Sequence, residues 1–512
     1  MTKGQLAARI LPAVAVAAVL AASFMASPAR LHSTLVASCG YSYGGYGFGP
    51  PPVVTGVSPD FGGVGGGTNV TITGSGFCNN SQNVQFGGTD ATSFVLDNDS
   101  QIRAVSPAHA AGTVDITVIT DGGTSLASVA DEFTYKTDTP SVYTSQSPLR
   151  VLDTRTNGGK LGAGGTYILK LGGISVPANA TAVVINLTAT NTTAPSFFTV
   201  YPTGQARPLA SNLNWTTHQT IPNLAEVGLG TNGQINIFNA AGAADAVVDL
   251  EGYFAPPSGG TAGEFVPLSP ARVTDTRNGS GQANAGSHLH SGTVLNVQIT
   301  GAGGVPLTGV DAVVLNATVT NTSSPSFLTV YPTGTSRPLA SNLNWISGQT
   351  VPNRVVVKVG TGGQVSFYNL AGNTDVVVDV NGYITDSTAS GVAHFSLSPS
   401  RILDTRNGTG GFSSPIGPNG TISVNVAGQG GVPASGAVAV VANVTVTSTT
   451  AASVLTVYPN LTVRPNASDL NWVPGWTRAN LTVVMLGSDG KIAIHNGSGS
   501  VNVIVDVVGW FG

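Results

Sequence analysis

Residues 376–384 read Val-Val-Val-Asp-Val-Asn-Gly-Tyr-Ile, and this stretch closes one copy of a threefold internal repeat. A run of β-branched residues of this length is typical of a central strand that is buried on both faces. Similar closes occur at residues 247–254, Val-Val-Asp-Leu-Glu-Gly-Tyr-Phe, and at residues 504–511, Ile-Val-Asp-Val-Val-Gly-Trp-Phe. The repeat therefore decides the fold of most of the chain.

Other phrases recur in the same order in every copy. Each copy opens with Asp-Thr-Arg, continues with an Asn-x-Thr strand and a Thr-Val-Tyr-Pro phrase, and then carries Ser-Asn-Leu-Asn-Trp or Ser-Asp-Leu-Asn-Trp. The tyrosines of the third phrase are 130 and 127 residues apart, at positions 201, 331 and 458. Solenoid and propeller repeats have periods of about 20 to 50 residues. Each copy is therefore expected to form a domain, at residues 141–255, 264–385 and 393–512.

The composition predicts an all-β protein. Charged residues make up only 9% of the 512 residues, against about 25% in an ordinary soluble domain. The Val and Thr that replace them favour strands, and the many Gly, Asn and Pro favour turns. No amphipathic helical stretch of ten or more residues is present. We expect three tandem β-sandwiches, preceded by an immunoglobulin-like sandwich, with negligible helix outside a signal peptide.

Residues 53–135 form a separate unit of short strands. Val70-Thr-Ile-Thr-Gly74 and Val114-Asp-Ile-Thr-Val118 alternate, and Asp121-Gly-Gly123 closes a hairpin. The unit also contains Gly74-Ser-Gly-Phe77, Phe86-Gly-Gly88, and a closing Phe133-Thr-Tyr135. On these residues it resembles the IPT/TIG family of immunoglobulin-like domains. The resemblance implies an Ig-like sandwich but no single activity, since such domains serve as spacers, adhesion modules and enzyme accessories.

The three copies themselves resemble domains that recur in secreted actinobacterial proteins, alone or beside hydrolase domains. The resemblance rests on the Asp-Thr-Arg opening, the Asn-x-Thr strand, the Ser-Asn-Leu-Asn-Trp phrase and the Val-Asp-x-x-Gly-Tyr-Phe close. It names no function.

The N-terminal segment predicts export. Lys3 and Arg9 precede an uncharged run rich in Ala, Val and Leu, and Ser27-Pro-Ala29 supplies small residues for cleavage. We interpret residues 1–29 as a secretory signal peptide; the alternative is a membrane anchor. Residues 30–52 form a Gly/Tyr/Pro-rich linker. The protein is expected to be secreted, and either free or associated with the cell surface.

The two cysteines, Cys39 and Cys78, are candidates for a disulfide, which export permits. The alternative is that Cys39 carries a lipid, because Val36-Ala-Ser-Cys39 resembles a lipoprotein-processing box. Apart from that lipid, only the signal peptide would contact a membrane. The 20 basic residues are scattered, whereas a nucleic-acid partner needs clustered Lys and Arg, so none is expected.

Two carboxylates recur in each copy, one near its start and one near its end. If the first and last strands pair, these residues approach each other and become candidates for Ca²⁺ binding or glycoside hydrolysis. The alternative is structural: the Arg of Asp-Thr-Arg lies two residues from its Asp, on the same strand face, and neutralises a buried charge. The carboxylates are Asp153, Asp249, Asp275, Asp379, Asp404 and Asp506.

The Ser-Asn-Leu-Asn-Trp phrase is the strongest binding candidate. A sugar offers apolar C–H faces and hydroxyl groups, so its site needs an aromatic plate beside amides and an arginine. The alternative is that each Trp caps a sandwich core while Asn and Ser shape a turn. The candidate residues are Trp215, Trp345, Trp472, Asn214, Asn344, Asn471, Arg207, Arg337 and Arg464.

The pattern favours a non-enzymatic protein that needs no cofactor. No His occupies an equivalent place in all three copies and the copies contain no Cys, so a shared nucleophile is not expected. We expect a secreted binding or adhesion protein whose partner is an extracellular polysaccharide such as cell-wall glycan, or another surface protein. The alternatives are a self-associating extracellular array and, less favoured, a glycoside hydrolase.

Overall fold

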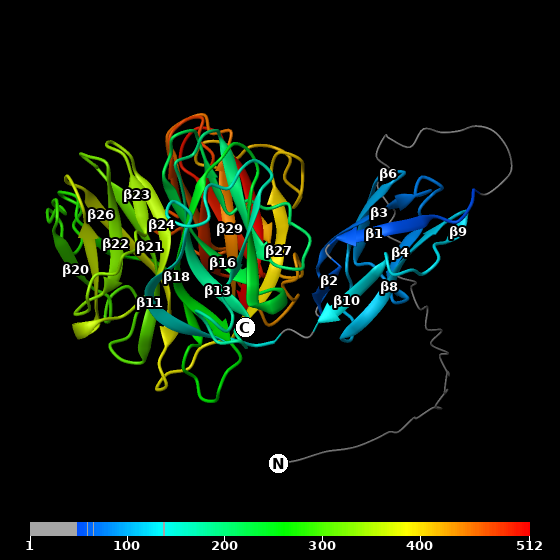
Figure 1. Ribbon diagram of the computed structural model, residues 1–512, viewed down its shortest axis with the longest axis horizontal. Coiled ribbons are helices and arrows are strands. Elements are labelled where there is room, and N and C mark those ends of the chain that lie inside the picture. Colours follow the sequence, from blue (N-terminus) through cyan, green and yellow to red (C-terminus); the bar gives the residue numbers. More distant parts are fainter. Residues whose placement is uncertain (1–48, 59, 65, 137–138) are drawn as a thin grey trace, which may run out of the picture.

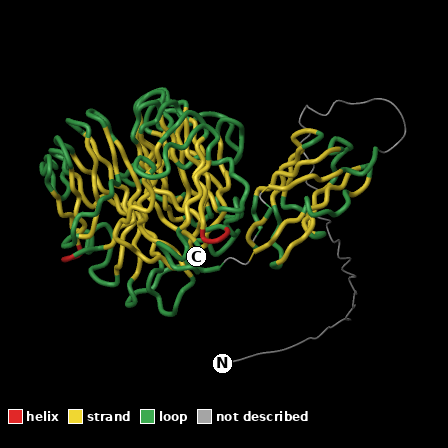
Figure 2. Tube along the Cα trace, viewed as in Figure 1, coloured by secondary structure: helices red, strands yellow, loops and turns green. Residues whose placement is uncertain are grey.

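The computed structural model describes residues 49–58, 60–64, 66–136 and 139–512. The predicted signal peptide (1–29), most of the linker (30–52) and Cys39 lie outside these residues, so the cleavage, lipid and disulfide predictions stay predictions. The described chain is almost entirely strand and loop, and its only helical turns are Thr231–Gly233 and Thr361–Gly363 (Figure 2). This confirms the predicted all-β fold. None of the described helices is long and apolar enough to span a membrane.

The N-terminal unit is a sandwich of two sheets that enclose an aromatic core. Phe77, Phe86 and Phe133 are fully buried and Tyr135 is 1% exposed. The Tyr135 hydroxyl donates to the carbonyl of Pro107 at 2.9 Å, which joins the last strand to the loop after β7. One sheet has the order β1 (Val53–Ser58), β3 (Asn69–Ser75), β7 (Gln101–Val105) and β6 (Ser93–Asn98); the other contains β2 (Phe61–Gly63), β10 (Glu132–Lys136), β8 (Gly112–Thr120), β4 (Asn83–Phe86), β5 (Thr89–Asp90) and β9 (Gly123–Thr124).

Each of the three repeats forms two four-stranded antiparallel sheets. In repeat 1 (141–255), the inner sheet has the order β11 (Val142–Asp153), β18 (Asp245–Ala255), β13 (Ala182–Thr190) and β16 (Ile221–Gly228), and the outer sheet has the order β12 (Thr166–Lys170), β17 (Gln234–Asn239), β14 (Ser196–Pro202) and β15 (Leu213–Trp215). The first and last strands pair, and the last strand lies between two others. The repeated close is therefore a central strand, as the sequence predicts.

Repeats 2 and 3 have the same topology. The inner sheets are β19 (Phe265–Asp275), β26 (Asp375–Thr385), β21 (Val310–Thr320) and β24 (Val351–Lys358) in repeat 2, and β27 (His394–Asp404), β34 (Asn502–Phe511), β29 (Ala439–Thr447) and β32 (Arg478–Met485) in repeat 3. The outer sheets are β20 (Val294–Gln298), β25 (Gln364–Asn369), β22 (Ser326–Pro332) and β23 (Leu343–Trp345), and β28 (Thr421–Asn425), β33 (Lys491–Asn496), β30 (Ser453–Pro459) and β31 (Leu470–Trp472).

The three inner sheets pack against one another, so the repeats share a fourth core besides their own. This shared core contains Val184, Val314 and Val441 at equivalent positions of the three repeats. The edge strands β16, β24 and β32 contact each other pairwise, and the three sandwiches gather into one body (Figure 1). The central strands of the inner sheets, such as β13 and β18, are buried along almost all of their length without alternation, because the repeat's own core covers one face and the neighbouring repeats cover the other.

A closed ring of asparagines joins the repeats. The Asn353 amide donates to Asn186 Oδ1 at 2.9 Å, from repeat 2 to repeat 1. Equivalent bonds run from Asn480 to Asn316 at 2.9 Å and from Asn223 to Asn443 at 3.0 Å. Three equivalent bonds that each lead to the next repeat define a pseudo-threefold axis. We call residues 141–512 in this arrangement the internal trimer.

The contacts between repeats differ in charge around the axis. Arg354 of repeat 2 is fully buried and donates to Asp469 of repeat 3 at 2.7 Å and to the Leu481 carbonyl at 3.1 Å. Its equivalents in the other repeats, Leu224 and Leu481, are apolar. A buried cation needs such acceptors because an unpaired one is very costly. The contact between repeats 2 and 3 is therefore distinguished from the other two by the buried single-copy ion pair of Arg354 and Asp469.

Candidate functional site

The six recurrent aspartates lie at the join between the first and last strands of each repeat. Arg150 donates to Asp249 at 2.6 Å and forms an ion pair with Asp153 at 3.3 Å. Arg155, the arginine of Asp-Thr-Arg, binds Asp153 from the other side at 2.5 Å. The same three ion pairs recur in repeats 2 and 3, through Arg272, Arg277, Arg401 and Arg406. The carboxylates do approach each other, as the pairing of these strands predicts, but an arginine lies between them.

Burial raises the pKa values of these carboxyl groups, and the neighbouring arginines lower them. The hydrogen bond from Arg155 is the largest influence on Asp153 and holds its pKa below the usual value. Burial dominates at Asp249 and raises its pKa despite the bond from Arg150. Arg150 also donates to the Leu339 carbonyl of repeat 2 at 2.9 Å. The arrangement therefore stabilises the join and a contact between repeats, and the guanidinium stands where a shared Ca²⁺ would have to bind. Within the described residues, no cluster of three acidic, His or Cys side chains is placed to hold a metal ion.

The three tryptophans of the repeated phrase point into the cores of their own repeats. Trp215, Trp345 and Trp472 are each 4% exposed. The Trp215 indole packs edge-on against Phe198 with ring centroids 4.6 Å apart, and its Nε1 donates to the Ala194 carbonyl at 3.1 Å. An indole enclosed in this way has no open face on which a sugar ring can stack. The geometry is that of the core-capping alternative, and these three residues drop out of the candidate binding surface.

The asparagine before each tryptophan faces the other way, on the solvent side of the outer sheet. The candidate arginine lies eight residues before each tryptophan, in the preceding loop, and is exposed. In repeat 1, Asn214 of β15 lies opposite Phe197 of β14, and Phe238 of β17 lies opposite Thr199. Directly opposed residues of antiparallel strands share a face, so these side chains form one row. Phe197, Phe238 and Asn214 are half-buried. The guanidinium carbon of Arg207 lies 3.9 Å from the centre of the Phe238 ring.

Repeat 2 carries the same row. Asn344 lies opposite Phe327, and the Phe327 and Tyr368 rings have centroids 6.4 Å apart. Arg337 stacks on Tyr368 at 3.7 Å. In the described residues, neither Arg207 nor Arg337 forms an ion pair or a side-chain hydrogen bond. We call these surfaces the outer rows: Asn214, Phe197, Phe238 and Arg207 in repeat 1, and Asn344, Phe327, Tyr368 and Arg337 in repeat 2.

Repeat 3 keeps the asparagine and the arginine but loses the two rings. Asn471 lies opposite Val454, and His495 replaces the stacked ring and contacts Arg464 through Nε2. Burial, and then the charge of Arg464, lower the pKa of His495. The outer face of repeat 3 therefore has no aromatic plate. The structure therefore places the candidate asparagine and arginine beside aromatic rings in repeat 1 (Asn214, Arg207) and in repeat 2 (Asn344, Arg337). In repeat 3, Asn471 and Arg464 have no such rings beside them.

Comparison with known proteins places one part of the chain in a family. Residues 52–135 match the model of the IPT/TIG domain family. This confirms the resemblance of the N-terminal unit. The IPT/TIG domain covers less than a fifth of the chain, and the resemblance of the three repeats to actinobacterial domains stays a prediction. None of the curated proteins matches the chain.

Solved structures match only loosely. A Bacteroides ovatus SGBP-B from a mixed-linkage glucan utilization locus, in complex with a mixed-linkage heptasaccharide, is 13% identical over 38% of this chain and 53% of its own, with a TM-score of 0.18. An SGBP-B from a xyloglucan utilization locus in Bacteroides uniformis is 14% identical over 66% of this chain and 100% of its own, with a TM-score of 0.15. An archaeal virus protein described by a triple jelly roll fold is 11% identical over 73% and 90%, with a TM-score of 0.16. Scores this low give no support to a shared ligand.

Proposed function

We propose that the chain is an extracellular, non-enzymatic polysaccharide-binding protein that engages glycan through the outer rows of repeats 1 and 2. The observation that carries the proposal is the row itself, which presents two aromatic rings, an amide and an arginine on one solvent-facing sheet. The arginine stacks on one of the rings but has no ion pair or side-chain hydrogen bond within the described residues. Aromatic rings pack against the C–H faces of sugars, and amide and guanidinium groups bind hydroxyls. The predicted signal peptide supports an extracellular location.

Duplication of the row supports a polymeric ligand. A single shallow site on an open sheet binds weakly, but two sites on one chain gain avidity on a repeating polymer, by about 10²- to 10⁴-fold where the spacing permits. The outer sheets of the internal trimer lie on the sides away from the axis, so the two rows face different directions. This geometry suits the bridging of separate polymer strands better than attachment to one flat surface.

The ion pairs at the recurrent aspartates support a binding role over catalysis. A glycoside hydrolase needs two free carboxyl groups flanking the scissile bond. Here Arg150 bonds both Asp153 and Asp249, and the equivalent arginines do the same in the other repeats. These six carboxylates are therefore occupied in holding strands together.

The proposal is tested by retention of the full chain on insoluble peptidoglycan, chitin, xylan and cellulose. We expect retention on at least one polymer, and we expect Arg207→Ala/Arg337→Ala to weaken it by roughly tenfold or more, since a hydrogen bond to a charged group contributes about 1.5–3 kcal/mol. The matched control is Arg464→Ala, which removes the equivalent arginine where the rings are missing and should leave retention unchanged. Retention on none of the polymers, or an equal loss in the control, would contradict the proposal.

A further inference from the structure

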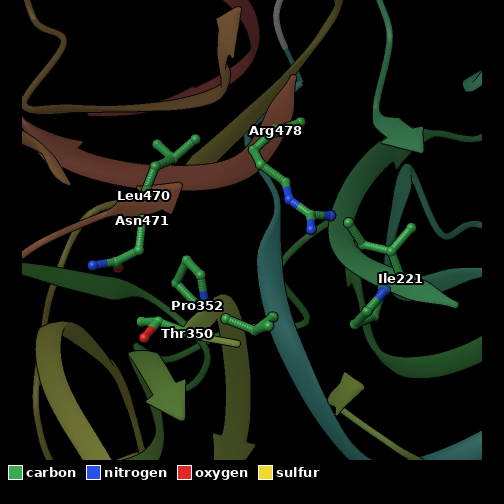
Figure 3. Close-up of a pocket in the computed structure, with 9 residues that line it drawn as sticks. Ile221, Thr350, Pro352, Leu470, Asn471 and Arg478 are labelled. Atoms are coloured by element: carbon green, nitrogen blue, oxygen red, sulfur yellow. The ribbon is translucent and has the colours of Figure 1, made fainter. Parts of the chain in front are cut away.

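A narrow crevice opens where the edge strands of all three inner sheets begin. It is lined by Ile221 and Pro222 of β16, Val351 and Pro352 of β24, and Arg478 of β32. The crevice is shallow and open: its own cavity volume is only about 10 Å³, and the volume reaches about 320 Å³ when the solvent at its mouth is included. A ligand would therefore lie across the mouth and not inside a closed pocket. Figure 3 shows the Arg478 side chain reaching from its strand toward the space between Ile221 and Pro352. No part of the outer rows of repeats 1 and 2 borders this crevice.

Arg478 departs from the residues at the equivalent positions. Ile221 and Val351 are 6% and 7% exposed and belong to the apolar cores of repeats 1 and 2. Two residues before Arg478, Trp476 stands where the other repeats have Gln219 and Gln349. The guanidinium carbon of Arg478 lies 4.1 Å from the centre of the Trp476 ring. Two neighbouring changes in one repeat thus create an arginine backed by an aromatic plate.

The Arg478 guanidinium has no acidic partner among the residues that the structure describes. No ion pair and no side-chain hydrogen bond reaches it, whereas the buried Arg354 of repeat 2, which lies on the opposite strand face toward the shared core, has several acceptors. Burial lowers the pKa of Arg478 to about 10. A guanidinium has five N–H donors, and partial burial without acceptors is costly. An apolar residue would fill this position at lower cost, as it does twice in the same chain.

We propose that the crevice binds a ligand carrying a carboxylate, which pairs with the Arg478 guanidinium against the Trp476 ring. The planar fork of an arginine matches a carboxylate with two parallel hydrogen bonds. The apolar walls from Ile221, Val351 and Pro352 restrict water at the pair and strengthen it. An acidic sugar such as a uronic acid has this group. The crevice is then a second site, separate from the outer rows and specific to the acid.

The proposal is tested by titrating the full chain with sodium glucuronate and following heat and tryptophan fluorescence. Glucose supplies the matched neutral sugar, and sodium chloride and sodium sulfate supply matched ions. We expect saturable binding of glucuronate alone. Arg478→Val, which restores the residue of repeat 2, should weaken it by roughly ten- to hundredfold, whereas Arg207→Ala/Arg337→Ala should leave it unchanged.

Three results would overturn the proposal: no saturable signal with glucuronate, equal binding of sulfate, or full binding by Arg478→Val. Arg478→Gln is a second variant that retains polarity in case the valine variant fails to fold, and it should show the same loss. Because the outer-row variant is measured in parallel, failure of this site and failure of the proposed function are distinguished.

Discussion

Repeats 1 and 2 differ from repeat 3 in the side chains on their outer faces and at the start of one edge strand, and these differences separate scaffold from specialised chemistry. The buried tryptophans, the ring of asparagines and the arginine-bridged aspartates occur in all three repeats, and each of these features holds strands or repeats together. The aromatic rings of the outer rows occur only in repeats 1 and 2. Arg478 and Trp476 occur only in repeat 3. Varying positions are therefore of two kinds: buried single-copy charges such as Arg354, which join neighbouring repeats, and exposed side chains, where binding chemistry is to be sought.

The largest expected effect concerns the single-copy ion pair that distinguishes the contact between repeats 2 and 3. Arg354→Leu introduces the residue of the other repeats but leaves Asp469 buried without its cation, which should lower the free energy of unfolding by about 3–5 kcal/mol. Chemical denaturation measures this.

The chain supplies the control for that variant. Arg354→Leu/Asp469→Asn makes both positions identical to repeat 1, where Asn212 accepts the Val200 amide at 2.7 Å. The double variant should regain most of the lost stability. Equal instability of the single and double variants would show that the pair does not act as a unit.

The next largest expected effect is a pH dependence of stability caused by Glu251. The equivalent residues in repeats 2 and 3 are Asn381 and Val508. Its carboxyl group accepts from the Asn342 amide at 2.7 Å, and burial raises its pKa to about 8 from 4.5. The folded protein therefore retains a proton that the unfolded chain releases, and the stability contributed below pH 4.5 is lost as the pH rises toward 8.

Glu251→Gln should remove this dependence. Between pH 5 and 9, the unfolding temperature of the wild type should fall relative to that of the variant, by an amount corresponding to a few kcal/mol. Parallel curves for the two proteins would mean that Glu251 is ionised in the fold.

A smaller difference in stability is expected between variants of the equivalent arginines Arg150 and Arg401. Arg150 and Arg272 each donate to a carbonyl of the next repeat, Leu339 and Asn466, at 2.9 and 3.0 Å. In the part of the chain that the structure describes, Arg401 makes no such bond. Arg150→Ala should therefore cost about 1 kcal/mol more than Arg401→Ala. Denaturation of both variants checks this, and an equal cost would remove the role of Arg150 between repeats.

The smallest expected effect is a gain in polysaccharide binding when repeat 3 is given aromatic rings. Val454→Phe/His495→Tyr gives repeat 3 the rings of repeat 2, beside the existing Asn471 and Arg464. A third row should raise retention on the bound polysaccharide a few-fold through avidity. Phe at the inward position Leu455 is the matched control, since it adds an aromatic residue to the core face. A gain with that control instead would place binding elsewhere.

Much of the fold is predictable from the sequence because strand alternation and repetition are local signals. The long apolar close was interpreted as a strand buried on both faces, and the structure confirms it. The packing of the three sandwiches against each other was not predicted, because a run buried on both faces does not say what covers the second face. The sequence does contain one indication of this packing: three positions are charged in one copy and uncharged in the other two. They are Arg354, Asp469 and Glu251.

Strand alternation decides between the two alternatives that the sequence leaves open for the tryptophans. In Leu213-Asn-Trp215 the first and third side chains share one face and Asn214 takes the other, so a buried leucine carries its tryptophan into the core. The same alternation in Phe197-Phe198 sends one ring out and one in. The rings that line the outer rows do not stand out in the sequence because repeat 3 has Val454 and His495 at their positions, so they belong to no phrase shared by all three copies. These rings are Phe197, Phe238, Phe327 and Tyr368.

The proposed binding of glycan through the rings of repeats 1 and 2 can be measured as the affinity of ring variants for the retained polysaccharide. Phe238→Ala and Tyr368→Ala should each reduce binding toward that of one remaining row, and the double variant should abolish it while keeping the unfolding temperature of the wild type within a few degrees. His495→Ala, the equivalent change in repeat 3, should leave the affinity unaltered. Wild-type affinity in the folded double variant would contradict the account.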